Sequence, residues 1–443
     1  MIAHIIWFAI ISQVYGKFDP IAFTVGQPQQ SAEHFSGNST ITYPIVITIH
    51  NPTANISNGI FTCSRDGIYK FKVFGCSATY GHFILDLYKN SAALATLYGH
   101  VNGANVAASN TVIVQLKLGD TVKVKSKTSV PVSLYNSGLK ENTFTGVQLG
   151  SQPLYSGDHA VIAFSATSNH HQNVVGDAIV QYHTQLVDDR GVLDLSTGVF
   201  TARSSGYYVL HFSSTSMQNE ELWLDLWANK DHVERYICSI YAFVDFEWAS
   251  AGNTVIVHLA SGEQVAVFSR SGHVSRLFGS SDYQFTSFSG TQIISDDDLS
   301  NPDAEPVVIF SVGLSKNATV SSGASILFDT IFVDLKRSYN KNTGVFVVPV
   351  TGIYEFHFHC LSRADSNLNL ALYRSNRAVV GFYNIRNAAH SFSAGNAAVL
   401  ELTGGETISI KADDYNYLLG APNEVYCTFS GYMLHSTGPI VIG

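Results

Sequence analysis

The chain has 443 residues, too many for one typical domain, and this length predicts two to four domains. Hydrophobic residues make up 46% and aromatic residues 12%, which is enough apolar surface to exclude a disordered chain. Charged residues are only 13% and the net charge is −9, so nucleic acid is excluded as a partner. The abundance of Tyr, Phe, Val and Thr favours sheets over helices.

Residues 1–16 have the pattern of a secretory signal peptide. Ile5 to Ile11 form an apolar core that is too short to span a bilayer, and Val14 and Gly16 stand at the −3 and −1 positions of a cleavage site. The alternative is a buried first strand, because no Lys or Arg precedes the core. No later stretch is long and apolar enough for a membrane helix. We therefore expect a secreted, extracellular protein without membrane insertion.

The rest of the chain repeats one pattern three times. Each copy opens on an apolar-aromatic strand, continues through two glycine phrases eight residues apart, turns at a Gly-acid pair and closes on Phe-Thr-Gly or Phe-Ser-Gly. This order and spacing predict three tandem domains at residues 18–150, 158–294 and 305–436. The landmarks are Phe23, Gly59, Gly67, Gly119 and Gly146 in the first copy, Phe164, Gly198, Gly206, Gly262 and Gly290 in the second, and Phe310, Gly344, Gly352, Gly405 and Gly431 in the third.

The segments between these landmarks alternate with a period of two, which predicts strands. After Gly67, the side chains of Tyr69 and Phe71 point to one face, while Lys70 and Lys72 point to the other. Many short strands without a long amphipathic helix predict an all-β sandwich or jelly roll. The residues assigned to its core are Phe23, Tyr69, Phe71, Phe164, Tyr208, Phe310, Tyr354 and Phe356.

The strand after each Gly-acid turn matches on its inner face and differs on its outer face. The inner residues are all Val or Ile. We interpret this contrast as one fold that carries three different surfaces. The outer residues are Lys123 and Lys125 in the first copy, Ala266 and Phe268 in the second, and Ser409 and Lys411 in the third.

As an ordered set, these landmarks resemble the C1q globular domain, a relative of the tumour necrosis factor jelly roll. The departures are Glu263 and Glu406 in place of Asp in the turn, Leu210 in place of Phe, and the lack of a collagen-like Gly-x-y segment before any copy. The resemblance implies a ten-stranded jelly roll that associates as a trimer. It also implies loops and outer strands that bind glycans, polyanions or cell-surface ligands, and it leaves room for bound calcium.

Three copies in one chain are compatible with two kinds of assembly. The copies can fold into a pseudo-trimer within the chain, or they can form a homo-oligomer between chains. Linkers of about ten residues span roughly 30 Å when extended, which is enough to join neighbours around an axis.

No catalytic or cofactor motif accompanies the repeat, so we expect a non-enzymatic protein without a cofactor. His357 and His359 alternate on one strand face and could bind a metal together, but the sequence identifies no further ligand, so no metal site is predicted. The acidic stretch 296–307 lacks the glycine and the closing glutamate of a calcium loop and is interpreted as a linker.

Charge is distributed unevenly among the copies: +4 in residues 17–150, −8 in residues 151–294 and −5 in the remainder. Lys123, Lys125 and Lys127 share one strand face of the basic copy. This face is a ligand patch for anionic polymers, a solvated surface, or a contact with the acidic copies. The leading hypothesis is a lectin-like recognition protein. The alternative is a matrix component or a signalling ligand for a receptor.

Exported proteins commonly carry disulfides and glycans. Cys63 with Cys76, and Cys360 with Cys427, are candidate disulfides, while free buried thiols are an equal alternative and Cys238 has no partner within its copy. Three Asn-x-Ser/Thr triplets are candidate glycosylation sites, at Asn38, Asn55 and Asn317.

Overall fold

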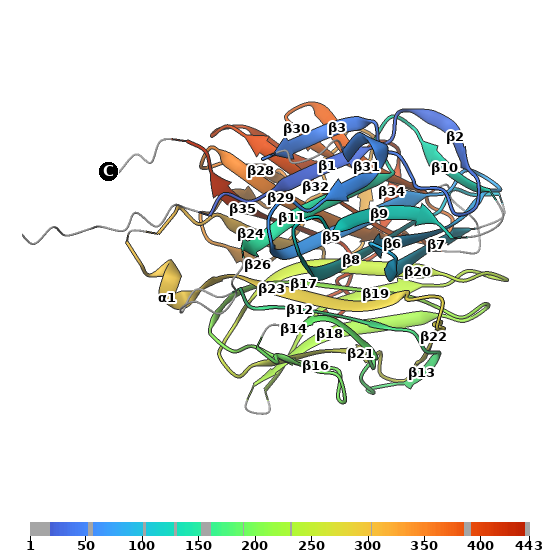
Figure 1. Ribbon diagram of the computed structural model, residues 1–443, viewed down its shortest axis with the longest axis horizontal. Helices are drawn as coiled ribbons and strands as arrows, with labels where there is room; N and C mark the ends of the chain where they lie inside the picture. Colours follow the sequence, from blue (N-terminus) through green and yellow to red (C-terminus); the bar gives the residue numbers. More distant parts are fainter. Residues whose placement is uncertain are drawn as a thin grey trace, which may run out of the picture.

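The computed structural model describes residues 18–51, 56–100, 103–127, 131–151, 161–188, 190–230, 233–302, 304–384 and 391–438. These residues form three β-sandwiches, so the predicted all-β fold is confirmed (Figure 1). Domain 1 contains β1 to β11, domain 2 contains β12 to β23, and domain 3 contains β24 to β35. The proposed signal peptide lies outside the described residues. No helix among them is long and apolar enough to cross a membrane.

Each domain has a five-stranded antiparallel inner sheet, and the strand order is the same in all three. In domain 1 the order is β3 (Ile45–His50), β1 (Ala22–Gly26), β11 (Thr143–Ser151), β5 (Gly67–Cys76) and β8 (Ala107–Leu116). In domain 2 it is β14 (Thr184–Asp188), β12 (Ala163–Ser168), β23 (Thr286–Ser295), β17 (Gly206–Thr215) and β20 (Ser250–Leu259). In domain 3 it is β26 (Thr330–Asp334), β24 (Ile309–Gly313), β35 (Thr428–Ser436), β29 (Gly352–Leu361) and β32 (Ser393–Leu402).

An outer sheet covers one face of each inner sheet. In domain 1 it contains β4 (Ile60–Thr62), β9 (Thr121–Ser126), β6 (His82–Lys89) and β7 (Ala92–His100). In domain 2 it contains β15 (Leu193–Asp194), β16 (Val199–Thr201), β21 (Gln264–Ser269), β18 (Leu222–Lys230) and β19 (Val233–Ala242). In domain 3 it contains β27 (Tyr339–Asn340), β28 (Val345–Val347), β33 (Thr407–Ala412), β30 (Leu368–Arg374) and β31 (Arg377–Asn384).

A two-stranded ribbon completes each sandwich, and two short helices lie between strands in the part of the chain that the structure describes. The ribbons pair β2 (Gln30–Phe35) with β10 (Val132–Asn136), β13 (Gln172–Val175) with β22 (Val274–Leu277), and β25 (Ala318–Val320) with β34 (Asn416–Leu418). The helices are the 3-10 turn η1 (Ile56–Asn58) and α1 (Asp296–Leu299).

Aromatic side chains fill the space between the two sheets of each domain. Phe23 packs on Phe61 with ring centroids 5.5 Å apart, and Phe310 packs on Phe346 at 4.4 Å in the same place of domain 3. The closing glycine of the repeat is required because these rings lie against its backbone: a Cβ on Gly146 would come within 2.4 Å of the Phe23 ring. The side chains assigned to the core are all 1% exposed or less, namely Phe23, Tyr69, Phe71, Phe164, Tyr208, Phe310, Tyr354 and Phe356.

The repeated tyrosine has a polar role at the edge of this core. Its ring is buried, and its hydroxyl donates a hydrogen bond to the backbone carbonyl four residues earlier. A buried hydroxyl needs such a partner, and this bond ties the turn before the strand to the sandwich. The three bonds are Tyr69 to Arg65 at 2.6 Å, Tyr208 to Ser204 at 2.7 Å and Tyr354 to Val350 at 2.5 Å.

The three sandwiches pack on one another in a closed ring within the single chain. In Figure 1, β8 of domain 1 runs alongside β17 and β20 of domain 2. One buried asparagine per domain accepts a hydrogen bond through Oδ1 from a hydroxyl of the next domain, in the cycle 1 to 2 to 3 to 1. The three pairs are Asn110 with Ser287 at 2.6 Å, Asn253 with Thr428 at 2.5 Å, and Asn396 with Thr143 at 2.8 Å.

Titratable side chains from β5, β17 and β29 meet in the centre of this ring, and we call them the axial cluster: Lys70, Lys72, His211, Glu355, His357 and His359. Lys70 Nζ donates to Glu355 Oε2 at 2.7 Å and to Tyr432 Oη at 2.8 Å. Both ends of this ion pair are about 1% exposed. The variable faces of β5, β17 and β29 therefore contact the neighbouring domains, and their divergence matches the domains to one another.

Burial controls the protonation of this cluster. Burial lowers the pKa of His357 to about 4, against the opposing attraction of Glu355. It lowers the pKa of Lys72 to about 7 and those of His211 and His359 well below the usual histidine range. Burial alone would raise the pKa of Glu355, but the charges of Lys70 and His357 outweigh it and hold that pKa below its usual range.

Removing one partner of the buried ion pair should lower the free energy of unfolding far more than removing both partners. We expect Lys70→Met to destabilise the chain by about 3–5 kcal/mol, because Glu355 is left charged in a dry site. Lys70→Met combined with Glu355→Met should recover most of this loss. Chemical unfolding of the full chain measures both changes, and Lys123→Met serves as a surface control. Equal stability of the single and double variants would contradict the assignment.

The axial histidines should make the chain sensitive to acid. In the unfolded chain they titrate near pH 6.5, whereas in the folded chain their pKa values are lower. Between these values the unfolded state binds more protons, so stability falls as the pH falls from about 7 toward 4. Each histidine contributes at most about 1.4 kcal/mol per pH unit in this window. Thermal unfolding at pH 5 and 7.5 should show this loss.

The loss of stability at low pH should be smaller in His357→Gln, because that variant removes one histidine whose pKa is lowered in the folded chain. It should persist in His34→Gln, which changes an exposed histidine on β2 that is not part of the axial cluster. A pH profile that is the same in the wild-type chain and in His357→Gln would refute the role of the cluster.

Candidate functional site

The three lysines of the predicted ligand patch lie on or just beyond β9, and they do not form one open surface. Lys125 Nζ lies 5.5 Å from the centre of the Tyr88 ring. Lys127 Nζ pairs with the buried Asp86 at 3.1 Å and lies 4.5 Å from the ring centre of Tyr283, which belongs to domain 2. Lys127 therefore contributes to a contact between domains, and Lys70 and Lys72 do so from the axial cluster.

The cysteines are free buried thiols, which was the alternative to disulfides. All five are free and buried, so neither candidate disulfide is present in the structure. Cys76 Sγ donates to the Tyr383 carbonyl at 3.2 Å and thereby touches domain 3. Of the candidate glycosylation sites, Asn38 and Asn317 are exposed, and Asn55 lies outside the described residues. Glycosylation at these positions stays a prediction.

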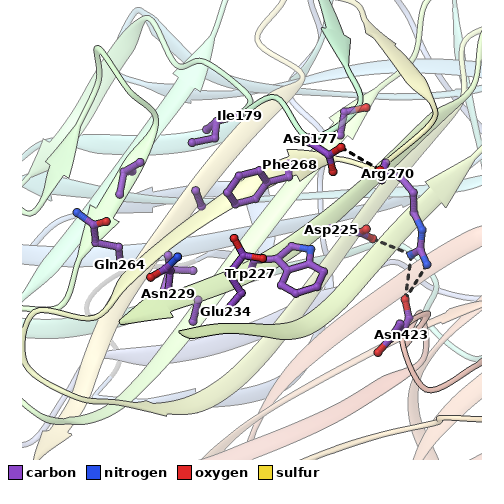
Figure 2. A pocket seen from close by; sticks show the side chains of 16 residues that line it. Asp177, Ile179, Asp225, Trp227, Asn229, Glu234, Gln264, Phe268, Arg270 and Asn423 are labelled. Carbon is purple, nitrogen blue, oxygen red and sulfur yellow. Dashed lines mark hydrogen bonds and ion pairs between the residues drawn. The ribbon is translucent and has the colours of Figure 1, made fainter. Parts of the chain in front are cut away.

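The candidate site is a pocket of about 610 Å³ on the outer sheet of domain 2 (Figure 2). Its floor is formed by Trp227 on β18 and Phe268 on β21, two half-buried rings on the outward face of the sheet. Amides and carboxylates surround these rings (Figure 2). The polar residues that line the pocket are Asp177, Asp225, Asn229, Glu234, Gln264, Ser269, Arg270, Ser271 and Asn423.

The repeat explains why this pocket is in domain 2. Trp227 pairs with Ala266, and Tyr88 of domain 1 and Tyr373 of domain 3 occupy the matching place in their sheets. In domain 1 a lysine lies over the tyrosine ring, and in domain 3 Lys411 does the same at 5.1 Å. Domain 2 has Phe268 at the position of that lysine. Of the three equivalent rings, Trp227 of domain 2 is therefore the one that no lysine at this position covers.

Arg270 closes one end of the pocket and links two domains. Its guanidinium donates to Asp225 Oδ1 at 3.1 Å and to the Asn423 carbonyl of domain 3 at 2.9 Å (Figure 2). The same group lies 4.7 Å from the centre of the Trp223 ring. These contacts fix the guanidinium, so it shapes the pocket and has little freedom to capture an anion.

The pocket has an acidic balance. Asp177, Asp225 and Glu234 carry three carboxylates against one guanidinium. Burial raises the pKa of Asp225, although Ser239 and Arg270 hydrogen-bond to it and oppose this shift. An anionic ligand would meet net negative charge here, whereas hydroxyl or amide groups would find several hydrogen-bond partners.

Among the described residues, no group of three or more His, Cys, Asp or Glu side chains is arranged to hold a metal ion. His357 and His359, which the sequence places on one strand face, are buried in the axial cluster beside Lys70 and Lys72. Two neighbouring ammonium groups disfavour a cation.

Ala266 and Phe268 were noted as outward residues in the sequence, but no site was predicted from them. The available signal was an exposed-face phenylalanine at the position where the other copies have lysine. Trp227, Glu234 and Arg270 were missed because they lie on β18, on β19 and directly after β21, and only the folded sheet brings them together.

The family model for the C1q domain matches residues 22–149, 163–293 and 309–434. The chain belongs to the C1q domain family. Each of its sandwiches is thus one C1q domain, and the resemblance stated from the landmarks is confirmed.

Individual relatives match one domain at a time. One of the subunits of the human complement C1q subcomponent is 30% identical over 128 residues, covering 29% of this chain and 50% of that protein. Mouse collagen alpha-1(X) chain is 27% identical over 130 residues, covering 29% of this chain and 19% of that protein. This chain therefore spans half or less of these relatives. The globular domain of zebrafish complement 1qA matches with 23% identity and a TM-score of 0.25, over 30% of this chain and 98% of that structure.

Proposed function

We propose that this C1q-domain protein is a secreted, non-enzymatic recognition protein that binds a neutral sugar residue of a glycan in the domain 2 pocket. The observation that carries the proposal is the uncovered pair of rings, Trp227 and Phe268, within a rim of amides and carboxylates. The apolar face of a sugar ring packs on an aromatic surface, and its hydroxyls need donors and acceptors around that surface.

Charge selects the kind of glycan. The pocket has three carboxylates and one committed guanidinium, and residues 151–294 carry a net charge of −8. Sulfated or sialylated chains would be repelled from this domain, while uncharged hexoses would not. The sequence predicted a glycan or another anionic ligand on the lysines of domain 1, and we infer instead a neutral glycan on the rings of domain 2.

The pocket is built on a rigid base of paired strands. Trp227 and Phe268 stand on adjacent paired strands, and Arg270 fastens the rim to domain 3. A site built on strands holds its geometry more closely than a site on loops. Such a base lowers the entropy lost when a ligand is bound.

A glycan array with the purified full chain tests the proposal. We expect binding to glycans that end in neutral hexoses, and a loss of tenfold or more in Trp227→Ala. Phe268→Lys should also lose binding, because it restores the residue that domains 1 and 3 carry. Tyr88→Ala, the matching change in domain 1, should bind normally, and thermal unfolding should show that each variant is folded.

The double variant Lys123→Glu with Lys125→Glu separates the two candidate surfaces. It should keep its glycan binding if the pocket is the site. Binding only to sulfated or sialylated glycans, with loss in this double variant, would reject the pocket and restore the lysine patch. Binding to no glycan, with a saturable protein receptor instead, would favour the signalling alternative.

A further inference from the structure

A groove of about 690 Å³ lies between domains 1 and 3. Residues 45–49 of β3 line one side, and β31 with the end of β32 lines the other (Figure 1). β3 is the edge strand of its sheet, and β1 is its paired neighbour. Along its other edge, the backbone of residues 45–49 has no hydrogen bond with any residue that the structure describes. Val46 is 53% exposed, and this part of the strand is therefore open to solvent.

The three junctions between domains differ at one backbone contact. In two of them, a backbone N–H of one domain donates to a carbonyl just before the closing strand of the next domain. These bonds are Thr96 N to the Gln284 carbonyl at 2.9 Å and Ser239 N to the Val425 carbonyl at 3.0 Å. At the junction of domains 3 and 1 the equivalent residues are Gly381 and Lys140, and no such bond joins them within the described chain. Leu139 packs there instead, because a Cβ on Gly381 would lie 2.9 Å from the Leu139 Cβ.

Two cations line the groove without a carboxylate partner among the described residues, namely Lys140 of domain 1 and Arg377 of domain 3. Arg374 also lines it but is paired with Glu406 at 2.7 Å. The carboxylate that lines the groove, Glu401, is exposed. Burial lowers the pKa of the Lys140 ammonium, and the nearby charge of Arg377 lowers it further. A bound carboxylate would relieve the repulsion between these two cations.

The repeat shows that this charge is special to one junction. The equivalents of Lys140 and Arg377 are Gln284 with Ala92 between domains 2 and 1, and Val425 with Arg235 between domains 3 and 2. Arg235 is neutralised by Glu263 at 2.7 Å. Two unpaired cations therefore meet in one of the three equivalent places, and this difference has no complement within the described part of the molecule.

We propose that this groove binds an extended peptide of a partner protein, which adds as a strand to the free edge of β3 and carries acidic side chains that contact Lys140 and Arg377. Strand addition supplies backbone hydrogen bonds, and the cations select the acidic residues. Proteins usually protect a free strand edge with charged residues or a covering segment, whereas β3 (IVITIH) has no Lys, Arg, Asp or Glu. A sulfated sugar would meet the same cations but would leave the backbone edge and the isoleucines of β3 unused.

Selection of a random octapeptide display library on the purified full chain tests the site. We expect the enriched peptides to alternate apolar residues and to contain Asp or Glu. A synthetic copy of an enriched peptide should bind in solution, as measured by fluorescence anisotropy, and its affinity should fall as salt is added. Methylation of alternate backbone nitrogens should abolish binding in one of the two registers, because it removes the donors that face β3.

Variants connect the peptide to the groove. Arg377→Glu and Lys140→Glu should each weaken binding by about tenfold, while Lys341→Glu, an exposed position of domain 3, should not. A peptide with lysine in place of its acidic residue should regain affinity for Arg377→Glu. Trp227→Ala should bind the peptide normally, so the result is independent of glycan binding, and thermal unfolding should show that each variant is folded.

Three results would overturn the proposal. They are the absence of enriched peptides, enrichment of peptides without acidic residues, and equal peptide binding by the wild-type chain and Arg377→Glu. Binding of a heparin octasaccharide that is lost in Arg377→Glu, with no peptide enriched, would assign the groove to a sulfated sugar instead.

Discussion

The buried contact between Lys70 and Glu355 governs the design of this protein. In a trimer of identical chains, the same residue occupies all three equivalent places around the axis, so a lysine would face two lysines. Here the three equivalent residues are Lys70, Val209 and Glu355. Fusing the domains into one chain allows opposite charges to meet at a position where symmetry would otherwise enforce repulsion.

Equivalent positions can also carry different residues on the outside of the molecule. Each outer sheet presents a ring at one equivalent place, Tyr88, Trp227 or Tyr373. In two domains a lysine covers the ring, and in the other Phe268 leaves it open. A single chain can therefore confine a binding surface to one domain, while the other two domains supply the rigid frame and the contact through Asn423.

The fold could be predicted from the sequence because its requirements are local and repeated. The period of two, the closing glycine that meets a phenylalanine ring, and the tyrosine that caps its own turn recur in each copy. The site could not be predicted, because Trp227, Phe268 and Arg270 are separated in the sequence. They come together only when β18 and β21 pair. The sequence placed Lys70 and Lys72 on the face opposite the core, but its alternation does not distinguish a face in solvent from a face against a neighbouring domain.

That distinction bears on how divergence among repeats should be interpreted. Outward residues that differ between copies are evidence for a ligand surface only where the outward face meets solvent. On β5, β17 and β29 the outward face meets the other domains, and the differences at one equivalent position are complementary: the Lys70 ammonium contacts the Glu355 carboxylate. On the outer sheets the differences have no such partner, and the exchange of a lysine for Phe268 leaves an aromatic surface uncovered. Complementary divergence thus builds the assembly, and unmatched divergence marks where a ligand can bind.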